Sequence, residues 1–172
     1  MKELAQAAAD LASGRDVLLD SIDGVSEADA RKSPGPGRWS ILDCVEHVAV
    51  VEDYLFGRIL AASDAAEPLA NLKREEKIRE FAPTRLRRIS APQFAIPTGK
   101  YPTLGEAARA FNLSRERTIR FVDECAGDLR AKITTHPLLG EVNCYETLLM
   151  MAAHPLRHAD QIREIRRTRS LT

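Results

Sequence analysis

The sequence lacks the features by which membrane-spanning and secreted proteins are recognised. Its longest strictly apolar run, residues 148–153, is far too short to cross a bilayer. The N-terminal residues MKELAQ carry charge in the first turn, and no apolar stretch with a cleavage site follows them. The three cysteines, Cys44, Cys125 and Cys144, are an odd set without paired spacing. We therefore expect reduced thiols and a cytoplasmic protein.

An excess of basic charge and a rich supply of aromatic residues are also missing. The 25 Lys and Arg residues balance 25 Asp and Glu residues, and aromatic residues make up 5% of the chain. A neutral chain without a basic or aromatic stripe is not expected to bind nucleic acid or anionic lipid. The 44% of hydrophobic and 29% of charged residues indicate a globular protein. Its 172 residues suit one domain, spanning 1–172.

What the sequence does contain is helical periodicity, whereas no segment alternates convincingly with the period of two that marks a strand. Three of the periodic segments begin with a polar pair typical of a helix cap, namely Ser40 with Asp43, Thr103 with Glu106, and Asn143 with Glu146. Stretches rich in Pro and Gly, such as residues 33–37, separate the segments. The predicted helices cover residues 3–22, 41–61, 103–126 and 143–167.

A long connection over residues 64–102 lies between the second and third predicted helices. Its prolines exclude a long helix, although a short one is predicted over residues 73–81. A connection of this length can run along a whole helix, whereas a short loop would force the two helices to lie antiparallel. The sequence therefore predicts an all-α four-helix bundle with a long crossover between helices two and three.

Three of the four histidines are predicted to point toward the bundle interior. At about 100° per residue, His154 and His158 fall within roughly 40° of each other on the apolar side of the last helix. His47 lies on the apolar arc of the second helix. The spacing His-x-x-x-His presents two nitrogen ligands to one cation, and a facing helix can supply a third. Such a site would keep positions open for water or substrate, as catalytic metal sites do.

The same spacing has a plainer interpretation, in which each inward histidine is a hydrogen-bonded core residue. Neighbouring uncompensated imidazoles are costly to bury, so the pattern alone leaves both interpretations open. Pro155 directly follows His154, removes a backbone donor and clashes with the carbonyl of Met151. We expect a kink there that changes the aim of His154 relative to His158.

Several stretches of the chain resemble the DinB-like superfamily. RWSILDCVEH at residues 38–47 is similar to the family signature W-S-x-x-x-x-x-E-H. HPLLG at 136–140, YETLL at 145–149 and HPLRHADQI at 154–162 are similar to the C-terminal part of that family. The similarity covers nearly the whole chain in order and spacing, and it is strongest at residues 38–56 and 136–165.

The resemblance implies a four-helix bundle in which His47, His154 and His158 bind one divalent metal ion, with zinc or nickel expected first and iron as a third choice. Relatives include thiol S-transferases that use bacillithiol or mycothiol, a thiol-dependent isomerase and metal-dependent hydrolases, and many are homodimers. We therefore expect a small-molecule substrate, such as a low-molecular-weight thiol, and a metal ion that activates a thiol or water. The competing expectation is a non-catalytic metal-binding or dimerisation module.

Two side chains near the histidines are weighed for a supporting role. Gln161 lies one turn beyond His158 on the inner edge of its helix. It is predicted either to hydrogen-bond a ligand imidazole or bound water, or to be a buried amide satisfied by backbone. Glu46 lies about 100° from His47. It is predicted to be a solvated or interface carboxylate rather than a general base.

The remaining candidates are given structural roles. Cys44 is predicted to be a small buried hydrophobe rather than a thiolate ligand, and His136 a structural residue of a turn over 134–140. Trp39 is predicted to pack at the helix entry, with the wall of a pocket as the alternative. On the last helix, the charged side chains are predicted to occupy the side opposite the histidines, namely Glu146, Arg157, Asp160 and Glu164.

Overall fold

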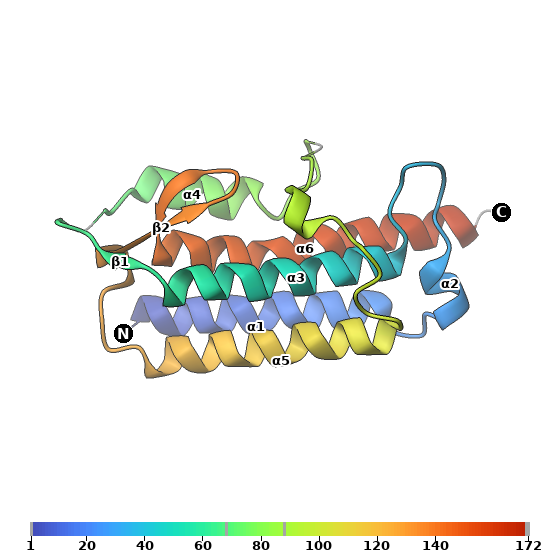
Figure 1. Cartoon of the computed structure of the whole chain (residues 1–172), viewed down its shortest axis with the longest axis horizontal. Helices are drawn as coiled ribbons and strands as arrows, with labels where there is room; N and C mark the ends of the chain where they lie inside the picture. Colours follow the sequence, from blue (N-terminus) through green and yellow to red (C-terminus); the bar gives the residue numbers. More distant parts are fainter. Residues whose placement is uncertain (1, 68, 88, 171–172) are drawn as a thin grey trace.

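The computed structural model, which describes residues 2–67, 69–87 and 89–170, is built around four long helices (Figure 1). They are α1 (Lys2–Ile22), α3 (Ile41–Leu60), α5 (Leu104–Glu124) and α6 (Cys144–Ser170). Helices α1 and α3 each pack against both α5 and α6. Helix α3 runs parallel to α5 and antiparallel to α1 and α6, so the predicted crossover bundle is confirmed. No helix among the described residues is long and apolar enough to span a membrane.

The helix starts lie where the capping pairs predict them. Ser40 Oγ accepts from the Asp43 backbone N–H at 3.1 Å, and the Asp43 carboxylate accepts from the Ser40 N–H at 2.8 Å. The same reciprocal bonding joins Thr103 with Glu106, and Asn143 with Glu146. The predicted short helix is α4 (Leu72–Phe81). Helix α2 (Glu27–Arg31) was not predicted, because five residues are too few to display a period.

A small sheet is the main departure from the predicted all-helical chain. Its strands are β1 (Ser63–Asp64), β2 (Lys132–His136) and β3 (Gly140–Asn143), paired antiparallel in the order β1-β2-β3. The turn predicted over residues 134–140 is narrower, because β2 extends to His136 and pairs it with Gly140. Gly140 has φ +72°, a conformation that favours glycine. Strands of two to five residues carry too little alternation to be recognised from sequence.

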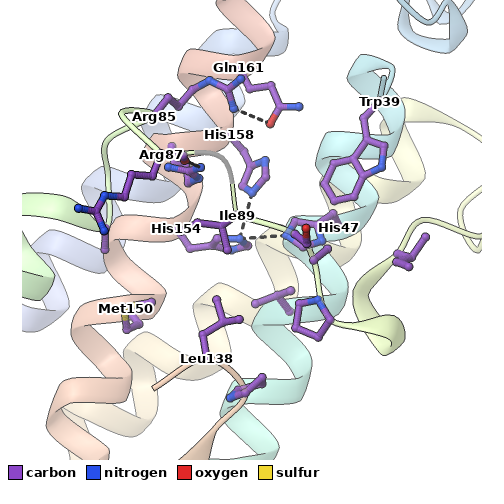
Figure 2. Close-up of a pocket in the computed structure, with 18 of the residues that line it drawn as sticks. Trp39, His47, Arg85, Arg87, Ile89, Leu138, Met150, His154, His158 and Gln161 are labelled. Atoms are coloured by element: carbon purple, nitrogen blue, oxygen red, sulfur yellow. Dashed lines mark hydrogen bonds between the residues drawn. The ribbon is translucent and has the colours of Figure 1, made fainter. Parts of the chain in front are cut away.

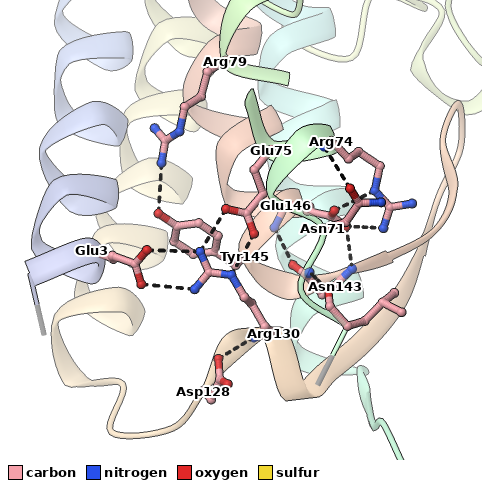
Figure 3. A network of polar contacts seen from close by, with 11 residues as sticks. Glu3, Asn71, Arg74, Glu75, Arg79, Asp128, Arg130, Asn143, Tyr145 and Glu146 are labelled. Atoms are coloured by element: carbon pink, nitrogen blue, oxygen red, sulfur yellow. Dashed lines mark hydrogen bonds and ion pairs between the residues drawn. The ribbon is translucent and has the colours of Figure 1, made fainter. Parts of the chain in front are cut away.

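Two partly buried ion pairs hold α4 in place, one to the start of α6 and one to the segment before β2 (Figure 3). Arg74 donates through Nε and Nη2 to the two carboxylate oxygens of Glu146, each at 2.6 Å. Arg130, from the short 3-10 helix η2 (Leu129–Ala131), pairs in the same way with Glu75 of α4. Glu146, which was predicted on the side of α6 opposite the histidines, is fully buried. Its partner comes from the long connection, which a helical wheel of α6 alone does not include.

The apolar core is divided into two clusters with a buried ion pair at the junction. Leu11 of α1 belongs to one cluster and Leu18 to the other. Arg115 of α5 and Glu52 of α3 are 0% and 3% exposed, and their charged groups meet at 2.7 and 2.8 Å. Arg115 also donates to the carbonyl of Leu11 at 2.7 Å. These bonds link α5 with α3 and α1, and a further bond from Arg115 to the Met151 carbonyl includes α6.

Pro155 does not end α6, which remains helical from Cys144 to Ser170. Proline leaves the carbonyl of Met151 without an intrahelical donor, and Arg115 Nη2 donates to that carbonyl at 2.6 Å. The neighbouring turn of α6 lies very close to α1, because a Cβ on Gly14 would stand 2.5 Å from the carbonyl oxygen of Ala152. The expected disturbance at Pro155 is thus compensated by the facing helices, just before His154.

Candidate metal centre

The Nε2 atoms of His47, His154 and His158 converge between α3 and α6 (Figure 2). His154 Nε2 lies 3.1 Å from His47 Nε2 and 3.0 Å from His158 Nε2, and all three ligand atoms lie within 4.8 Å of one another. His47 and His158 are buried, whereas His154 is partly exposed. The helical spacing and the facing helix therefore bring the predicted residues together.

A backbone carbonyl of the long connection sets the tautomer of His47. The Nδ1 atom of His47 lies 2.7 Å from the carbonyl oxygen of Ala95, in the 3-10 helix η1 (Gln93–Ala95). A carbonyl can only accept, so Nδ1 carries the hydrogen and the Nε2 lone pair faces the other two imidazoles. This arrangement is the one by which proteins orient metal-ligating histidines.

Burial keeps all three imidazoles in the neutral form. Desolvation is the largest cause lowering the pKa of His47, and the hydrogen bond to Ala95 acts in the opposite direction. Desolvation also holds the pKa values of His154 and His158 well below 6.5, with the neighbouring histidines as further causes. Neutral imidazole is the form that ligates metal ions, so near pH 7 the site offers three nitrogen lone pairs.

Hydrogen bonds alone do not satisfy this cluster. His47 Nε2 has no hydrogen to give, and a hydrogen on His154 Nε2 can point along only one of its two short contacts. If His158 Nε2 carries the hydrogen instead, His154 Nε2 accepts it, and the contact with His47 has no donor. At most one of the two contacts is therefore a hydrogen bond, and His158 Nδ1 is buried without a hydrogen-bond partner among the described residues. Zinc–nitrogen bonds are about 2.0–2.1 Å, and nitrogens 3.0 and 3.1 Å apart can share such an ion. The donor set fits a divalent metal ion.

Trp39 covers one side of the cluster. Its ring centroid lies 4.7 Å from that of His47 and 6.2 Å from that of His158, the latter pair being stacked. Trp39 directly precedes the cap of α3, so the motif that starts the helix also places an indole beside the histidines. It packs at the helix entry as predicted, and it also walls a pocket.

The histidines lie on the wall of a pocket with a volume of about 580 Å³. Sites for small molecules fall in this range of size. Helices α3 and α6 supply one part of the wall. The loop before α3, parts of the connection between residues 82 and 96, and the tip of the β2–β3 hairpin supply the rest. The long crossover is therefore part of the site rather than only a link between helices.

The pocket wall carries four arginines, Arg38, Arg85, Arg87 and Arg157, and no Asp or Glu among the described residues that line it. Arg157 was predicted on the side of α6 opposite the histidines, which is wrong. It donates to the backbone carbonyls of Thr84 and Arg87, so the connection covers that side of the helix. These arginines were not predicted as part of a site, although the run RLRR at residues 85–88 includes two of them, Arg85 and Arg87.

Gln161 also lines the pocket, near His158 (Figure 2). Its side-chain oxygen accepts from Arg85 Nη1 at 2.9 Å, and Arg85 Nε in turn donates to Glu164 at 3.0 Å. The structure therefore gives Gln161 an arginine partner from the connection, which neither sequence interpretation included. A role toward a metal-bound group stays a prediction.

Glu46 is neither solvated nor directed at the pocket. It is 2% exposed, and its Oε1 accepts from the backbone N–H groups of Thr98 and Gly99 at 2.7 and 3.1 Å. Of the two predicted positions, solvated or at an interface, the first is wrong, because the connection folds over this side of α3. Glu46, the acidic residue of the WS…EH motif, thus binds the backbone of the connection. The same connection contains Ala95, whose carbonyl orients His47.

Cys44 and His136 have the structural character that was predicted for them. Cys44 is fully buried outside the histidine group, and burial raises the pKa of its thiol to about 12. His136 lies at the end of β2, where its Nδ1 accepts from the backbone N–H of Leu138 at 3.2 Å. Burial lowers the pKa of His136 to about 4. His136 lines the pocket but is not part of the converging group.

Comparisons with known proteins agree with this fold. A curated relative, the uncharacterized protein YuaE of Bacillus subtilis (strain 168), is 21% identical over 147 residues, or 86% of this chain and 89% of that protein. The crystal structure of TT2238, a four-helix bundle protein, matches with a TM-score of 0.59 and 20% identity, over 94% of this chain and 98% of that one. The sequence model of the DinB superfamily matches residues 10–162. The chain therefore belongs to the DinB superfamily.

Proposed function

We propose that this protein binds one divalent metal ion through His47, His154 and His158 and is a metal-dependent enzyme. The observation that carries the proposal is the convergence of three neutral imidazole nitrogens at the wall of a 580 Å³ pocket. Imidazole suits zinc and nickel, which we propose first, and iron. Three protein ligands leave coordination positions open on the pocket side.

When bound, the ion would supply Lewis acidity, which lowers the pKa of a thiol or water and so yields a nucleophile near neutral pH. The chain's own residues contribute position and shelter. The carbonyl of Ala95 keeps the His47 lone pair directed at the site, and Trp39 closes one side against solvent. Transfer of a group to or from a low-molecular-weight thiol is the reaction we propose, with hydrolysis as the second choice.

The alternative is a module in which the ion only stiffens the bundle or supports dimerisation. A purely structural ion is normally closed off by four protein ligands, whereas here three ligands border a cavity. The position of the cavity therefore favours the enzyme over the module.

The first test is metal content. Metal-free protein is titrated with Zn²⁺ and with Ni²⁺ by calorimetry, for the wild type, His154→Ala and the control His136→Ala. We expect one ion per chain in the wild type and the control, and at least a hundredfold loss of affinity in His154→Ala. Absence of binding by the wild type, or equal binding by His154→Ala, would refute the metal site.

The second test separates the enzyme from the structural module. Unfolding of metal-loaded wild type, metal-free wild type and His154→Ala is compared, and metal-loaded protein is assayed with a panel of thiols and electrophiles and with hydrolysable esters and amides. We expect metal-free wild type and His154→Ala to remain folded with similar stability, because a chain that depends on a structural ion would unfold without it. Tight metal binding with turnover of no substrate in either panel, and a large loss of stability on metal removal, would favour the module.

A further inference from the structure

The pocket differs in charge from the rest of the molecule. The whole chain is neutral, with 25 basic and 25 acidic residues, yet four arginines and no Asp or Glu line the pocket among the described residues. Clefts lined by charges of one sign raise the local concentration of ligands of the opposite sign. A bound divalent ion would add to this positive potential. The pocket is therefore suited to an anion.

The arginines of the pocket differ in how far other groups of the protein already bind them. Arg157 is bound to two backbone carbonyls, and its pKa is lowered by burial and by the neighbouring positive charge of Arg85. Arg85 is partly neutralised by the half-exposed Glu164. The guanidinium of Arg87 is exposed and makes no ion pair with any residue that the structure describes. A ligand carboxylate can pair with Arg87 and Arg85, because guanidinium and carboxylate groups match in geometry.

The opposite part of the pocket is apolar. Figure 2 shows Arg85 and Gln161 on one side of the histidines and Met150 and Leu138 on the other. Two side chains of α3, Val51 and Leu55, also line the cavity. The histidines thus lie between a basic end and an apolar end, so a ligand that fills the pocket passes them along its length.

We propose that the pocket binds an organic acid with an apolar body. Its anionic group lies at Arg85 and Arg87, and its apolar part lies against Met150 and Leu138. The anion site itself does not depend on the proposed function. Only one point rests on that function, namely that the part of the ligand next to the histidines is the part that reacts. The arginines select the charge of the ligand, and the apolar wall selects its body.

The experiment uses the single tryptophan of the chain as the reporter, because Trp39 lines the pocket. Full-length protein freed of metal by a chelator is titrated with octanoate and with octanamide, which has the same chain and no charge. Tryptophan fluorescence and calorimetry follow binding. We expect octanoate to bind about tenfold more tightly than octanamide, and added salt to weaken octanoate alone.

Arg87→Gln is the decisive variant, since an exposed arginine can be replaced without disturbing the fold. Arg120→Gln on α5 is the matched control, because Arg120 is exposed, lies outside the pocket and loses the same charge. We expect Arg87→Gln to weaken octanoate about fivefold and to leave octanamide unchanged. Equal binding of the acid and the amide, or equal effects of the two variants, would overturn the inference.

The outcomes for this inference and for the metal site can be told apart. Octanoate that binds metal-free protein through Arg87 supports the anion site even if no metal binds. If octanoate binds only after metal loading and is indifferent to Arg87→Gln, the acid is coordinated by the ion. That result overturns the arginine site and leaves the metal site standing.

Discussion

Replacing Arg115 by methionine is expected to remove a large part of the stability of the bundle. The arginine is fully buried and pairs with Glu52, which is 3% exposed. It also donates to the carbonyls of Leu11 and Met151 at 2.7 and 2.6 Å. Methionine keeps an apolar stem of similar length but no donor. The variant therefore leaves one buried carboxylate and two buried carbonyls without this partner.

The expected loss can be worked out from these contacts. Removing one member of a buried ion pair costs about 3–5 kcal/mol. The carbonyl of Met151, which Pro155 leaves without an intrahelical donor, costs about 1–3 kcal/mol more when Arg115 is lost. The Leu11 carbonyl keeps its own donor within α1, so it adds little. The two main effects share one site and do not add fully, since water can enter the space. We expect the free energy of unfolding to fall by about 4–6 kcal/mol, out of the roughly 5–15 kcal/mol typical of a protein.

The assay is urea unfolding of metal-free protein followed by far-UV circular dichroism. Arg117→Met is a matched control on the same helix, because Arg117 pairs with Asp53 at 2.5 Å with both side chains about half exposed. Such surface pairs contribute about 0–1 kcal/mol. Losses for the two variants that agree within about 1 kcal/mol would refute the assigned role of Arg115. If Arg115→Met does not fold, Glu52→Gln is compared with Asp53→Asn.

Two further changes test the packing and the titration of buried groups. Gly14→Ala is expected to destabilise the protein by about 1–2 kcal/mol although alanine favours helix, because the new Cβ would meet the Ala152 carbonyl at 2.5 Å. In Gly57→Ala the new Cβ has no atom within 4 Å, and the variant should be more stable than the wild type by up to about 1 kcal/mol. If thermal unfolding shows that both variants raise the stability, or that both lower it, this reasoning is wrong. His136 has a pKa of about 4 when folded and 6.5 as its ordinary value, so the unfolded chain binds more protons and stability falls as the pH drops from about 6.5 toward 4. His136→Asn, which keeps an acceptor for Leu138, should remove up to about 2 kcal/mol of the loss between about pH 7 and about pH 5; unfolding curves with an unchanged pH dependence would exclude this role.

The parts of the fold that the sequence predicts correctly depend on near neighbours. The capping pair Ser40 and Asp43 is three residues apart, and His154 and His158 are separated by one helical turn. Such patterns are visible in a short window and need no knowledge of the rest of the chain. The facing position of His47 follows from the period of its own helix, once the bundle is assumed.

The parts that were predicted wrongly or missed depend on the connection between α3 and α5. Glu46 was predicted to be a solvated or interface carboxylate, and Glu146 to lie on the side of α6 opposite the histidines. A helical wheel shows only one helix, so it does not reveal that Thr98 of the connection binds Glu46 or that Arg74 pairs with Glu146. The carbonyl of Ala95, which orients His47, is 48 residues away in sequence. No pattern of residue types signals a backbone acceptor at such a separation.

The placement of the connection also bears on how proteins of this architecture can diverge. The three histidines stand on long helices whose packing depends on the core, while much of the pocket wall, including Arg85 and Arg87, belongs to residues 82–96. Substitutions or length changes in that segment can therefore alter ligand preference without repacking the bundle. Ala95 is the exception, because its carbonyl holds His47 through backbone geometry. Grafting residues 82–92 from one relative into another is thus a direct route to new specificity.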